Sequence, residues 1–422
     1  MIRAGFRRWF AIALWKRILG ALVLGAAAGA LLGEAAVDIK WIGDLFIRMI
    51  RMLIVPLVFV TLVSGVASMK DPARLGSIGV KAFGLYLATS LAAILIGIAM
   101  ALVLRPGSNV DLSGASSHDL GAPVPMLDRL LAIVPENVFT SFAAGDVLAI
   151  IFFAMLLGAG ILVAGEKAAP LTRGFDAGAE VMLKVTNIVM EVAPIGVFAL
   201  VAWVMGTEGP AAFVNVFLLA MVVYVGGLIH MVVTHGGLVR LFARMPFGQF
   251  FAGAREPQLL AYSTSSSAAT LPATLRAAEL KMGIKPPVAG SIIPLGATIN
   301  MDGTALYVAA VAVFGAQIFG VELKLFDYAM IALTTTLVSI GTASVPSASL
   351  FLMAVVLDVI GITPAQTALI IGFLLPFDRI LDMWRTVVNV TGDLAVATVV
   401  ATWEGEIESV AVSEEAPPVV VD

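Results

Sequence analysis

Long stretches of this chain contain no charged residue, and this constrains its fold more than any other feature. No Asp, Glu, Lys or Arg occurs between Ala82 and Leu104 or between Leu148 and Gly165. As helices, stretches of this length span the roughly 30 Å hydrocarbon core of a bilayer. Charged residues make up 13% of the chain and hydrophobic residues 60%, whereas a soluble domain carries roughly a quarter charged residues. The composition excludes a soluble enzyme, a nucleic-acid-binding protein and a disordered chain.

The formal net charge of −4 is set by the C-terminal end. Thr402–Asp422 contains six acidic residues and no Lys or Arg, and the rest of the chain without them has a net charge of +2. We therefore predict a solvated acidic tail, which implies no cationic partner. The chain has no Cys, so disulfides and thiolate metal sites are excluded.

Hydropathy predicts six membrane helices before residue 240, followed by a more interrupted stretch over 247–402. The expected helices lie near 12–33, 42–69, 79–104, 136–165, 174–205 and 211–239. Lys and Arg gather before the first helix, between the second and third, and after the sixth, whereas the alternate loops are poor in them. This asymmetry predicts cytoplasmic termini and an external loop over 105–128. The basic N-terminal arm precedes a first membrane helix rather than a cleaved signal peptide.

The C-terminal half interrupts its own apolar segments twice. Ser263–Pro272 and Ser339–Ser349 are Ser-rich, and each has short apolar arms on both sides. Each is followed by a longer segment with its own polar cluster, Asn300–Thr304 or Asp378–Asp393. Small and polar residues also serve close helix packing, but two such segments in corresponding positions favour a transporter built from internal repeats, with its binding sites at the bilayer midplane.

The last predicted membrane helix carries polar groups on one face. At about 100° per residue, six polar side chains fall in one narrow arc: Asp378, Asp382, Arg385, Thr386, Asn389 and Asp393. Such a face is costly against lipid unless its charges are paired, hydrated or bound to an ion. One possibility is an internal salt bridge of Arg385 with Asp382 or Asp378. The other is sodium bound by carboxylate, amide and backbone oxygens, with Arg385 left to hold an anionic substrate.

At these residues the chain resembles the glutamate transporter family, the dicarboxylate/amino acid:cation symporters. The resemblance is carried by Thr264–Pro272, Pro294–Tyr307, Ser339–Thr342 and Leu381–Asp393. It implies an all-α membrane protein with eight transmembrane helices, two re-entrant helical hairpins and inverted repeats, assembled as a homotrimer. Residues 1–240 then hold six helices, of which 1, 2, 4 and 5 form a scaffold and 3 and 6 join the transport unit. Residues 241–402 hold hairpin 1, helix 7, hairpin 2 and helix 8, and 403–422 form the acidic cytoplasmic tail.

The resemblance also implies a substrate site. In it, Arg385 and Thr304 bind the side-chain carboxylate of the substrate, and Asp382 and Thr386 bind its amino group. The α-carboxylate is bound by Asn389 and by the first hairpin tip at Ser266 and Ser267. Val345 closes the site from the second tip, where Ser349 adds a hydroxyl.

Three sodium sites follow from the same resemblance. The first is formed by Asn300, Asp393 and the carbonyls of Gly296 and Asn389. The second uses, mostly through carbonyls, Thr298, Met301, Ser339, Ile340 and Thr342. The third is formed by Asp302, Asn300, Tyr86, Thr89 and Ser90. The resemblance implies no cofactor besides these co-transported ions.

Some positions depart from the family pattern. Ser265 and Met383 stand where members place a tip or helix arginine, which leaves Arg379 either to replace that arginine or to snorkel. Val308 stands where the animal transporters carry a proton-accepting Glu, and Ser344, Ser347 and Ser349 replace glycines in the second tip. Proton and potassium coupling are therefore open.

Arg385 favours an acidic substrate over a neutral one, because a neutral ligand leaves a buried guanidinium unpaired. Asp382 favours an amino acid over a C4-dicarboxylate. We therefore predict sodium-coupled uptake of L-aspartate or L-glutamate across the inner cell membrane by elevator-type alternating access. The alternative is a C4-dicarboxylate or proton-coupled glutamate symporter of the same family.

Two rivals come from other classes. An intramembrane hydrolase needs a base for a tip serine, and the only histidines are His118, His230 and His235. Neither G-x-S-x-G nor H-E-x-x-H occurs, so no enzyme is predicted. A channel also has polar membrane faces, and substrate counterflow separates it from a carrier.

Overall fold

In a computed structural model the chain is almost entirely helical. The structure describes residues 12, 14–67, 72–108, 131, 134–144, 147–207, 209–340 and 349–408. The predicted basic arm, most of loop 105–128, His118, Thr342, Val345 and the end of the acidic tail lie outside this described part. Over the described residues the only β pairing is a single bridge between Ile284 and Ile407.

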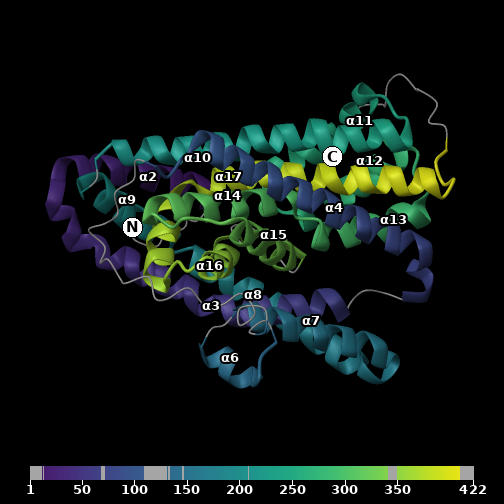
Figure 1. Ribbon diagram of the computed structural model, residues 1–422, viewed down its shortest axis with the longest axis horizontal. Coiled ribbons are helices and arrows are strands. Elements are labelled where there is room, and N and C mark those ends of the chain that lie inside the picture. Colours follow the sequence, from purple (N-terminus) through teal and green to yellow (C-terminus); the bar gives the residue numbers. More distant parts are fainter. Residues whose placement is uncertain are drawn as a thin grey trace, which may run out of the picture.

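Helices account for nearly all of the described chain, and Figure 1 shows the longest of them running side by side along one axis. In the first half they are α2 (Leu14–Leu32), η1 (Gly33–Ile39), α3 (Lys40–Ala67), α4 (Pro72–Leu104), α6 (Val138–Ala144), α7 (Val147–Ala164), η2 (Gly165–Ala168), α8 (Ala169–Met190), α9 (Ala193–Thr207) and α10 (Ala211–Ile229). The second half holds η3 (His230–Gly236), η4 (Val239–Ala243), α11 (Phe247–Thr264), α12 (Ser267–Met282), α13 (Pro286–Ile299), α14 (Asp302–Phe319), α15 (Leu325–Ile340), α16 (Ser349–Val359) and α17 (Pro364–Trp403).

Six helical segments of the described chain are long and apolar enough to cross a membrane. They are Lys16–Phe46, Ile78–Leu104, Phe152–Met190, Val214–Ala243, Pro286–Phe319 and Phe377–Trp403. The predicted fold class, an all-α membrane protein, is confirmed. The finer expectation of eight transmembrane helices and two re-entrant hairpins stays a prediction.

The helix expected over 174–205 is divided into two. Helix α8 ends at Met190 and α9 begins at Ala193, with a turn at Glu191 and Val192. Proline donates no backbone hydrogen bond and fits only the first turn of a helix, so Pro194 favours a new start here. The turn also lets Glu191 reach the buried Arg17 of α2, with Nη1 2.7 Å from Oε2.

Helices α2 and α9 approach closely through two glycines spaced four residues apart. A Cβ atom on Gly25 would lie 2.6 Å from the carbonyl oxygen of Phe198, and one on Gly29 would collide with the carbonyl oxygen of Ala202. Small residues at this spacing let two backbones touch, which is a common packing mode inside membranes.

The first Ser-rich interruption is the tip of a helical hairpin. Helices α11 and α12 pack against each other and are joined by Ser265 and Ser266. Ser265 ends α11 in the left-handed conformation, with φ 52°. Ser266 then caps α12, its hydroxyl accepting a hydrogen bond from the Ala269 backbone N at 3.2 Å, a strongly favoured N-cap arrangement.

The segment that follows is a broken helix, as the sequence predicts. Helix α13 ends at Ile299, and α14 starts at Asp302 after the non-helical Asn300 and Met301. Helices α15 and α16 pack together as a second helical pair, with 341–348 between them.

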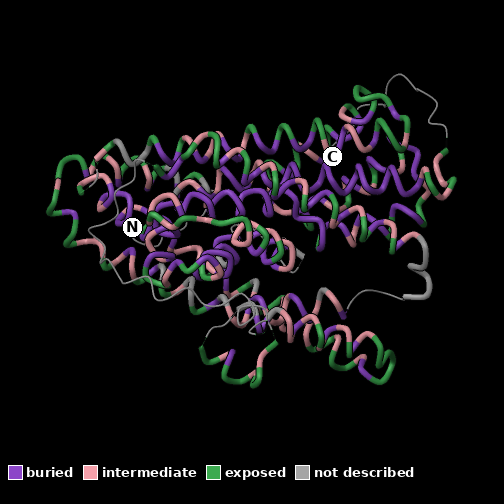
Figure 2. Tube along the Cα trace, viewed as in Figure 1, coloured by how far each residue is buried: buried purple, intermediate pink, exposed green. Residues whose placement is uncertain are grey.

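Helix α17 is the centre of the second half. It runs for 40 residues without a break and packs against α4, α10, α11, α12, α13, α14 and α16. Figure 2 shows that α17 and α14 are mostly buried, whereas α6, α7 and α8 are far more exposed. The polar face of α17 therefore lies inside the protein rather than against lipid.

The start of the predicted acidic tail is attached rather than free. Glu408 donates its backbone N–H to the carbonyl of Gly283 at 2.8 Å, and Lys285 donates to the carbonyl of Glu406 at 3.1 Å. The Lys285 ammonium also lies 2.6 Å from the Glu406 carboxylate, which raises the pKa of Lys285 above its usual value. The segment therefore ties the end of α17 to the α12–α13 turn.

Candidate functional site

Arg385 is the centre of the buried polar face of α17. The arginine is fully buried, and its Nη2 atom lies 2.8 Å from Oδ1 of Asp382 and 3.0 Å from Oδ1 of Asp378. The Asp382 contact is a directed hydrogen bond, whereas Asp378 forms a close ion pair without hydrogen-bond alignment. The helical spacing predicted from sequence therefore does bring these three charges together.

The other two nitrogens of the Arg385 guanidinium have no hydrogen-bond acceptor. Nε and Nη1 of Arg385 are buried and have no hydrogen-bond partner. The guanidinium carbon lies 4.1 Å from the ring centroid of Tyr307, which holds one face of the group by a cation–π contact. A buried donor without a partner costs about 1–3 kcal/mol, so two of them on one cation favour an anionic ligand that accepts both.

The internal salt bridge considered from sequence is present, yet it leaves part of the polar face unaccounted for. It uses Asp378, Asp382 and one nitrogen of Arg385. Asn389 and Asp393 lie further along the same face, are buried, and contact neither the guanidinium nor any other cationic side chain of the described chain. They instead accept hydrogen bonds from groups at the α13–α14 break, Asn389 from the Gly303 N–H and Asp393 from the Asn300 amide.

The remaining residues predicted to bind the substrate differ in the contacts that they make. Thr386 is buried and bonds its own helix, donating to the Asp382 carbonyl at 2.9 Å. Asn389 accepts a 2.7 Å hydrogen bond from the Gly303 backbone N–H, which joins α17 to the start of α14. Thr304 is buried one residue further on.

The structure gives fewer contacts for the residues at the two hairpin tips that are predicted to bind the substrate. Ser266 caps α12 and Ser267 is buried at its first position. Ser349, the first residue of α16, has a buried hydroxyl without a partner. Val345, predicted to close the site, lies outside the described residues.

The groups of the first predicted sodium site do come together. The Asn300 amide nitrogen lies 3.0 Å from Oδ1 of Asp393 and 3.4 Å from the carbonyl oxygen of Asn389. The backbone N–H of Asn300 donates to the Gly296 carbonyl at 2.7 Å. A Cβ atom on Gly296 would collide with Oδ1 of Asp393, so only glycine allows this approach.

The third predicted site is also assembled, from α4 and the α13–α14 break. Ser90 donates to Oδ1 of Asp302 at 2.7 Å, and Thr89 to Oδ1 of Asn300 at 3.4 Å. The Tyr86 hydroxyl donates to the Ile292 carbonyl. All are buried, and oxygen atoms of this kind are what a hard cation prefers.

No hydrogen bond among the described residues joins the members of the second predicted site. Thr298 and Ser339 bond the backbone of their own helices, at the carbonyls of Leu295 and Thr336. Met301 instead contacts Asn389 through its sulfur, at 3.2 Å. Ile340 ends α15, and Thr342 lies outside the described residues.

Two buried residues of this region were not predicted as ligands. His230 and His235 both contact Oδ2 of Asp302, through Nε2 at 3.1 and 2.9 Å. They belong to η3, a π-helical continuation of α10, and the sequence carries no sign of that helix type. Both rings are directed at this carboxylate, and neither forms a hydrogen bond to a serine of the described chain.

The predicted departures from the family pattern lie around the same helices. Val308 is buried in the apolar core of α14. Arg379 follows Asp378 on α17 and has a buried Nε without a partner. Both of its predicted roles are compatible with this position.

The sequence matches one protein family over nearly the whole chain. The model of the sodium:dicarboxylate symporter family matches residues 14–403. A proton/sodium-glutamate symport protein of Bacillus caldotenax is 34% identical over 404 residues, covering 93% of this chain and 94% of the relative. The proton/glutamate-aspartate symporter of Escherichia coli K12 is 33% identical over 414 residues, covering 93% of both chains.

Relatives with a different named substrate are nearly as similar. A C4-dicarboxylate transport protein of Azorhizobium caulinodans is 31% identical over 411 residues, covering 94% of this chain and 89% of the relative. Near full-length matches of both kinds, together with the family match over almost the whole chain, establish its membership. The chain belongs to the sodium:dicarboxylate symporter family.

Proposed function

We propose that this protein takes up L-aspartate or L-glutamate together with sodium ions. The observation that carries the proposal is the state of Arg385. One nitrogen of its guanidinium faces two carboxylates, and the other two are buried without a partner. A planar fork with two parallel donors matches a substrate carboxylate.

Asp382 supports an amino acid over a dicarboxylate without an amino group. Its carboxylate is largely buried beside Arg385, and an ammonium group on the substrate adds a second cationic partner there. A second carboxylate at the same place would instead be repelled. Relatives named for glutamate symport agree with this choice.

The sodium part of the proposal rests on two buried carboxylates. Asp302 and Asp393 contact no Lys or Arg in the described chain. Asp393 accepts a hydrogen bond from the Asn300 amide, and Asp302 accepts one from the Ser90 hydroxyl besides its two histidine contacts. Ionised groups at this depth are stabilised when a cation binds them. Asn300, Asp393, Gly296 and Asn389 form the first proposed sodium site, and Asp302 with Tyr86, Thr89 and Ser90 belongs to another.

The remaining parts of the proposal concern assembly and movement. We propose a homotrimer in the inner cell membrane, with cytoplasmic termini, in which the hairpins and α17 move together in an elevator-type cycle. The Lys and Arg distribution supports the orientation. The close α2–α9 packing supports a separate scaffold.

C4-dicarboxylate transport is the second candidate, favoured by relatives of that name at 31–32% identity. Proton-coupled glutamate transport is a variant of the first, because the names of the glutamate-transporting relatives include protons.

Uptake into proteoliposomes tests the proposal. Radiolabelled aspartate, glutamate and succinate are offered under a sodium, proton or potassium gradient imposed singly. We expect sodium-driven uptake of aspartate or glutamate, abolished in Arg385→Ala. Arg17→Gln is the control, because it removes a buried arginine of α2 that is not part of the proposed substrate site. It shows what the loss of a buried cation alone does to uptake. Succinate uptake without aspartate uptake, or uptake indifferent to sodium, would overturn the proposal.

A further inference from the structure

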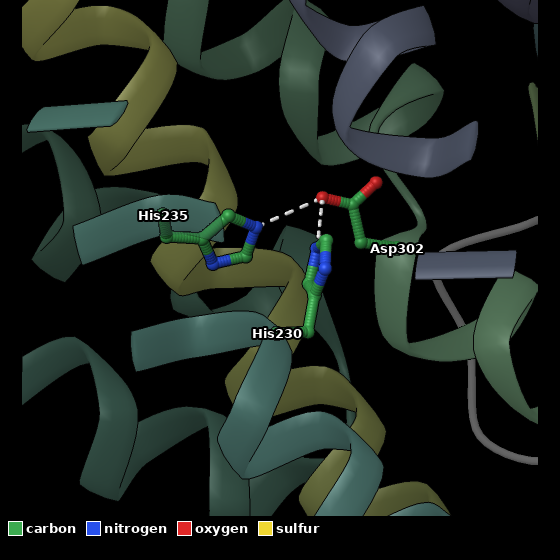
Figure 3. A group of neighbouring side chains, drawn as sticks. All are labelled: His230, His235 and Asp302. Carbon is green, nitrogen blue, oxygen red and sulfur yellow. Dashed lines mark hydrogen bonds and ion pairs between the residues drawn. The ribbon is translucent and has the colours of Figure 1, made fainter. Parts of the chain in front are cut away.

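Two imidazole rings and one carboxylate converge at a single point in the interior. Figure 3 shows His230 and His235 both directed at Asp302. The Nε2 atoms lie 3.1 and 2.9 Å from the same carboxylate oxygen, and the two ring centroids are 4.4 Å apart. All three side chains are fully buried.

The convergence depends on local helix geometry. Two side chains five residues apart in an α-helix point about 140° away from each other, at 100° per residue. Residues 230–236 are instead π-helical, and the wider turn, with its i→i+5 hydrogen bonds, brings residues i and i+5 closer to one face of the helix. Single π turns inside α-helices are rare and often lie at functional sites. Here the turn's effect is to put both rings on the side of Asp302.

Each ring of the cluster has one polar contact, that of its Nε2 atom with Asp302. Nδ1 of both rings is buried and bonds nothing, so no second hydrogen bond of either ring accounts for its burial. The other oxygen of Asp302 is held by Ser90 at 2.7 Å. This hydroxyl orients the carboxylate as outer partners of metal ligands do.

We propose that His230, His235 and Asp302 form a binding site for a divalent transition-metal ion of the zinc type. Imidazole nitrogen together with carboxylate oxygen is a ligand set that zinc and its neighbours favour. With bonds near 2.0–2.1 Å, neighbouring ligand atoms in a tetrahedral site are about 3.3 Å apart. The nitrogen–oxygen separations of 2.9 and 3.1 Å therefore need to open by only a few tenths of an ångström.

Both the local charge and the types of ligand atom favour a divalent transition-metal ion. Asp302 and Asp393 are two buried carboxylates without a Lys or Arg contact in the described chain, and a divalent ion offsets both charges. Sodium prefers oxygen ligands throughout, whereas two of the three groups here present nitrogen. Because the proposed function assigns Asp302 to sodium as well, the two ions exclude one another. This competition rests on the proposed function, whereas the metal site itself does not.

The chain offers a clean binding experiment. It contains no Cys and only three histidines, so few other residues bind zinc tightly. The full chain, purified without a polyhistidine tag and treated with chelator, is titrated with Zn²⁺ by calorimetry in sodium-free buffer. Co²⁺ is used as a spectroscopic probe, because tetrahedral coordination by nitrogen and oxygen gives strong visible absorption.

We expect one Zn²⁺ per chain in the wild type and in His118→Ala, which removes the histidine outside the cluster. His230→Gln and His235→Gln should each weaken binding by at least about tenfold, since even an outer partner of a metal ligand is worth that much. Thermal unfolding confirms that the variants fold, and Asp302→Asn supplies a further ligand variant. Equal binding by all of these proteins, or a loss in His118→Ala as large as in the others, would overturn the site.

A transport measurement separates this proposal from the proposed function. Zn²⁺ should inhibit sodium-driven uptake by the wild type, and added sodium should relieve the inhibition. His235→Gln should be at least about tenfold less sensitive. Uptake in chelator without Zn²⁺ reports the proposed function alone, and calorimetry reports the metal site whether or not uptake occurs.

Discussion

Asp382 and Arg385 lie one helical turn apart on α17, with the Asp382 carboxylate oxygen 2.8 Å from Nη2 of the guanidinium. The aspartate is therefore engaged before any substrate arrives. Its negative charge positions the arginine and is at the same time available to a substrate ammonium group. Under the proposed function, Asp382 thus links recognition of the two ends of an amino acid.

Replacing Asp382 with asparagine tests this double role. Losing a hydrogen bond between charged groups costs about 1.5–3 kcal/mol, or roughly tenfold to a hundredfold in affinity. In Asp382→Asn the Michaelis constant for aspartate should rise by that amount, while binding of succinate, which has no ammonium group, weakens less or improves. Competition of both ligands with labelled aspartate measures the ratio. An equal loss for both would show that Asp382 only positions Arg385.

We expect high sodium affinity to require that residue 296 has no side chain. An added Cβ atom would collide with Asp393 and lie 2.5 Å from the Tyr86 hydroxyl. Overpacking of this kind costs about 1–3 kcal/mol. Gly296→Ala should therefore raise the sodium concentration needed for half-maximal uptake by about fivefold or more.

Gly290 on the same helix provides the matched control. A Cβ atom there meets nothing within 4 Å, and alanine is favoured over glycine in a helix by about 0.8–1.0 kcal/mol. Gly290→Ala should keep the sodium dependence of the wild type and unfold at the same or a slightly higher temperature. Similar sodium dependence in both variants would contradict our placement of the first sodium site.

The tip of the first hairpin should be stabilised by a single change. Ser265 has a positive φ of 52° and a buried hydroxyl without a partner, and glycine relieves both. Ser265→Gly should raise stability by about 0.5–1 kcal/mol, seen as later thermal unfolding in detergent. Ser263→Gly, two residues earlier inside α11, should lower it instead. A change of the same sign in both would refute the argument.

The attached start of the C-terminal tail predicts different effects for two truncations. Deleting 409–422 leaves the Ile284–Ile407 bridge and the Lys285–Glu406 contacts intact. Deleting 406–422 removes them, and two lost backbone hydrogen bonds are worth about 1–3 kcal/mol together. Only the longer deletion should make the α12–α13 turn more sensitive to limited proteolysis. Equal cleavage rates would mean that the attachment contributes nothing.

Helical periodicity predicted much of the candidate site. Counting 100° per residue is valid along α17 because the helix is unbroken, and Asp382, Arg385 and Asn389 do share one buried face. The broken helix at Asn300 could also be predicted, because a polar cluster inside an apolar segment is costly in a membrane unless its groups line a binding site.

Other features could not be predicted because they depend on contacts between distant segments. The π turn that brings His230 and His235 together on Asp302 invalidates the same 100° count, and nothing in the local sequence signals it. The contact of Glu191, in the turn between α8 and α9, with Arg17 joins residues 174 positions apart. The attachment of the tail depends on a turn more than 100 residues earlier in the chain.

The continuity of α17 has a consequence for the fidelity of transport. The groups that we assign to substrate and to the first sodium ion lie along one rod of hydrogen-bonded backbone, within the three turns or so from Asp382 to Asp393. Their spacing cannot change without breaking that helix. Under the proposed function, the substrate and the first sodium ion are therefore carried at a fixed separation.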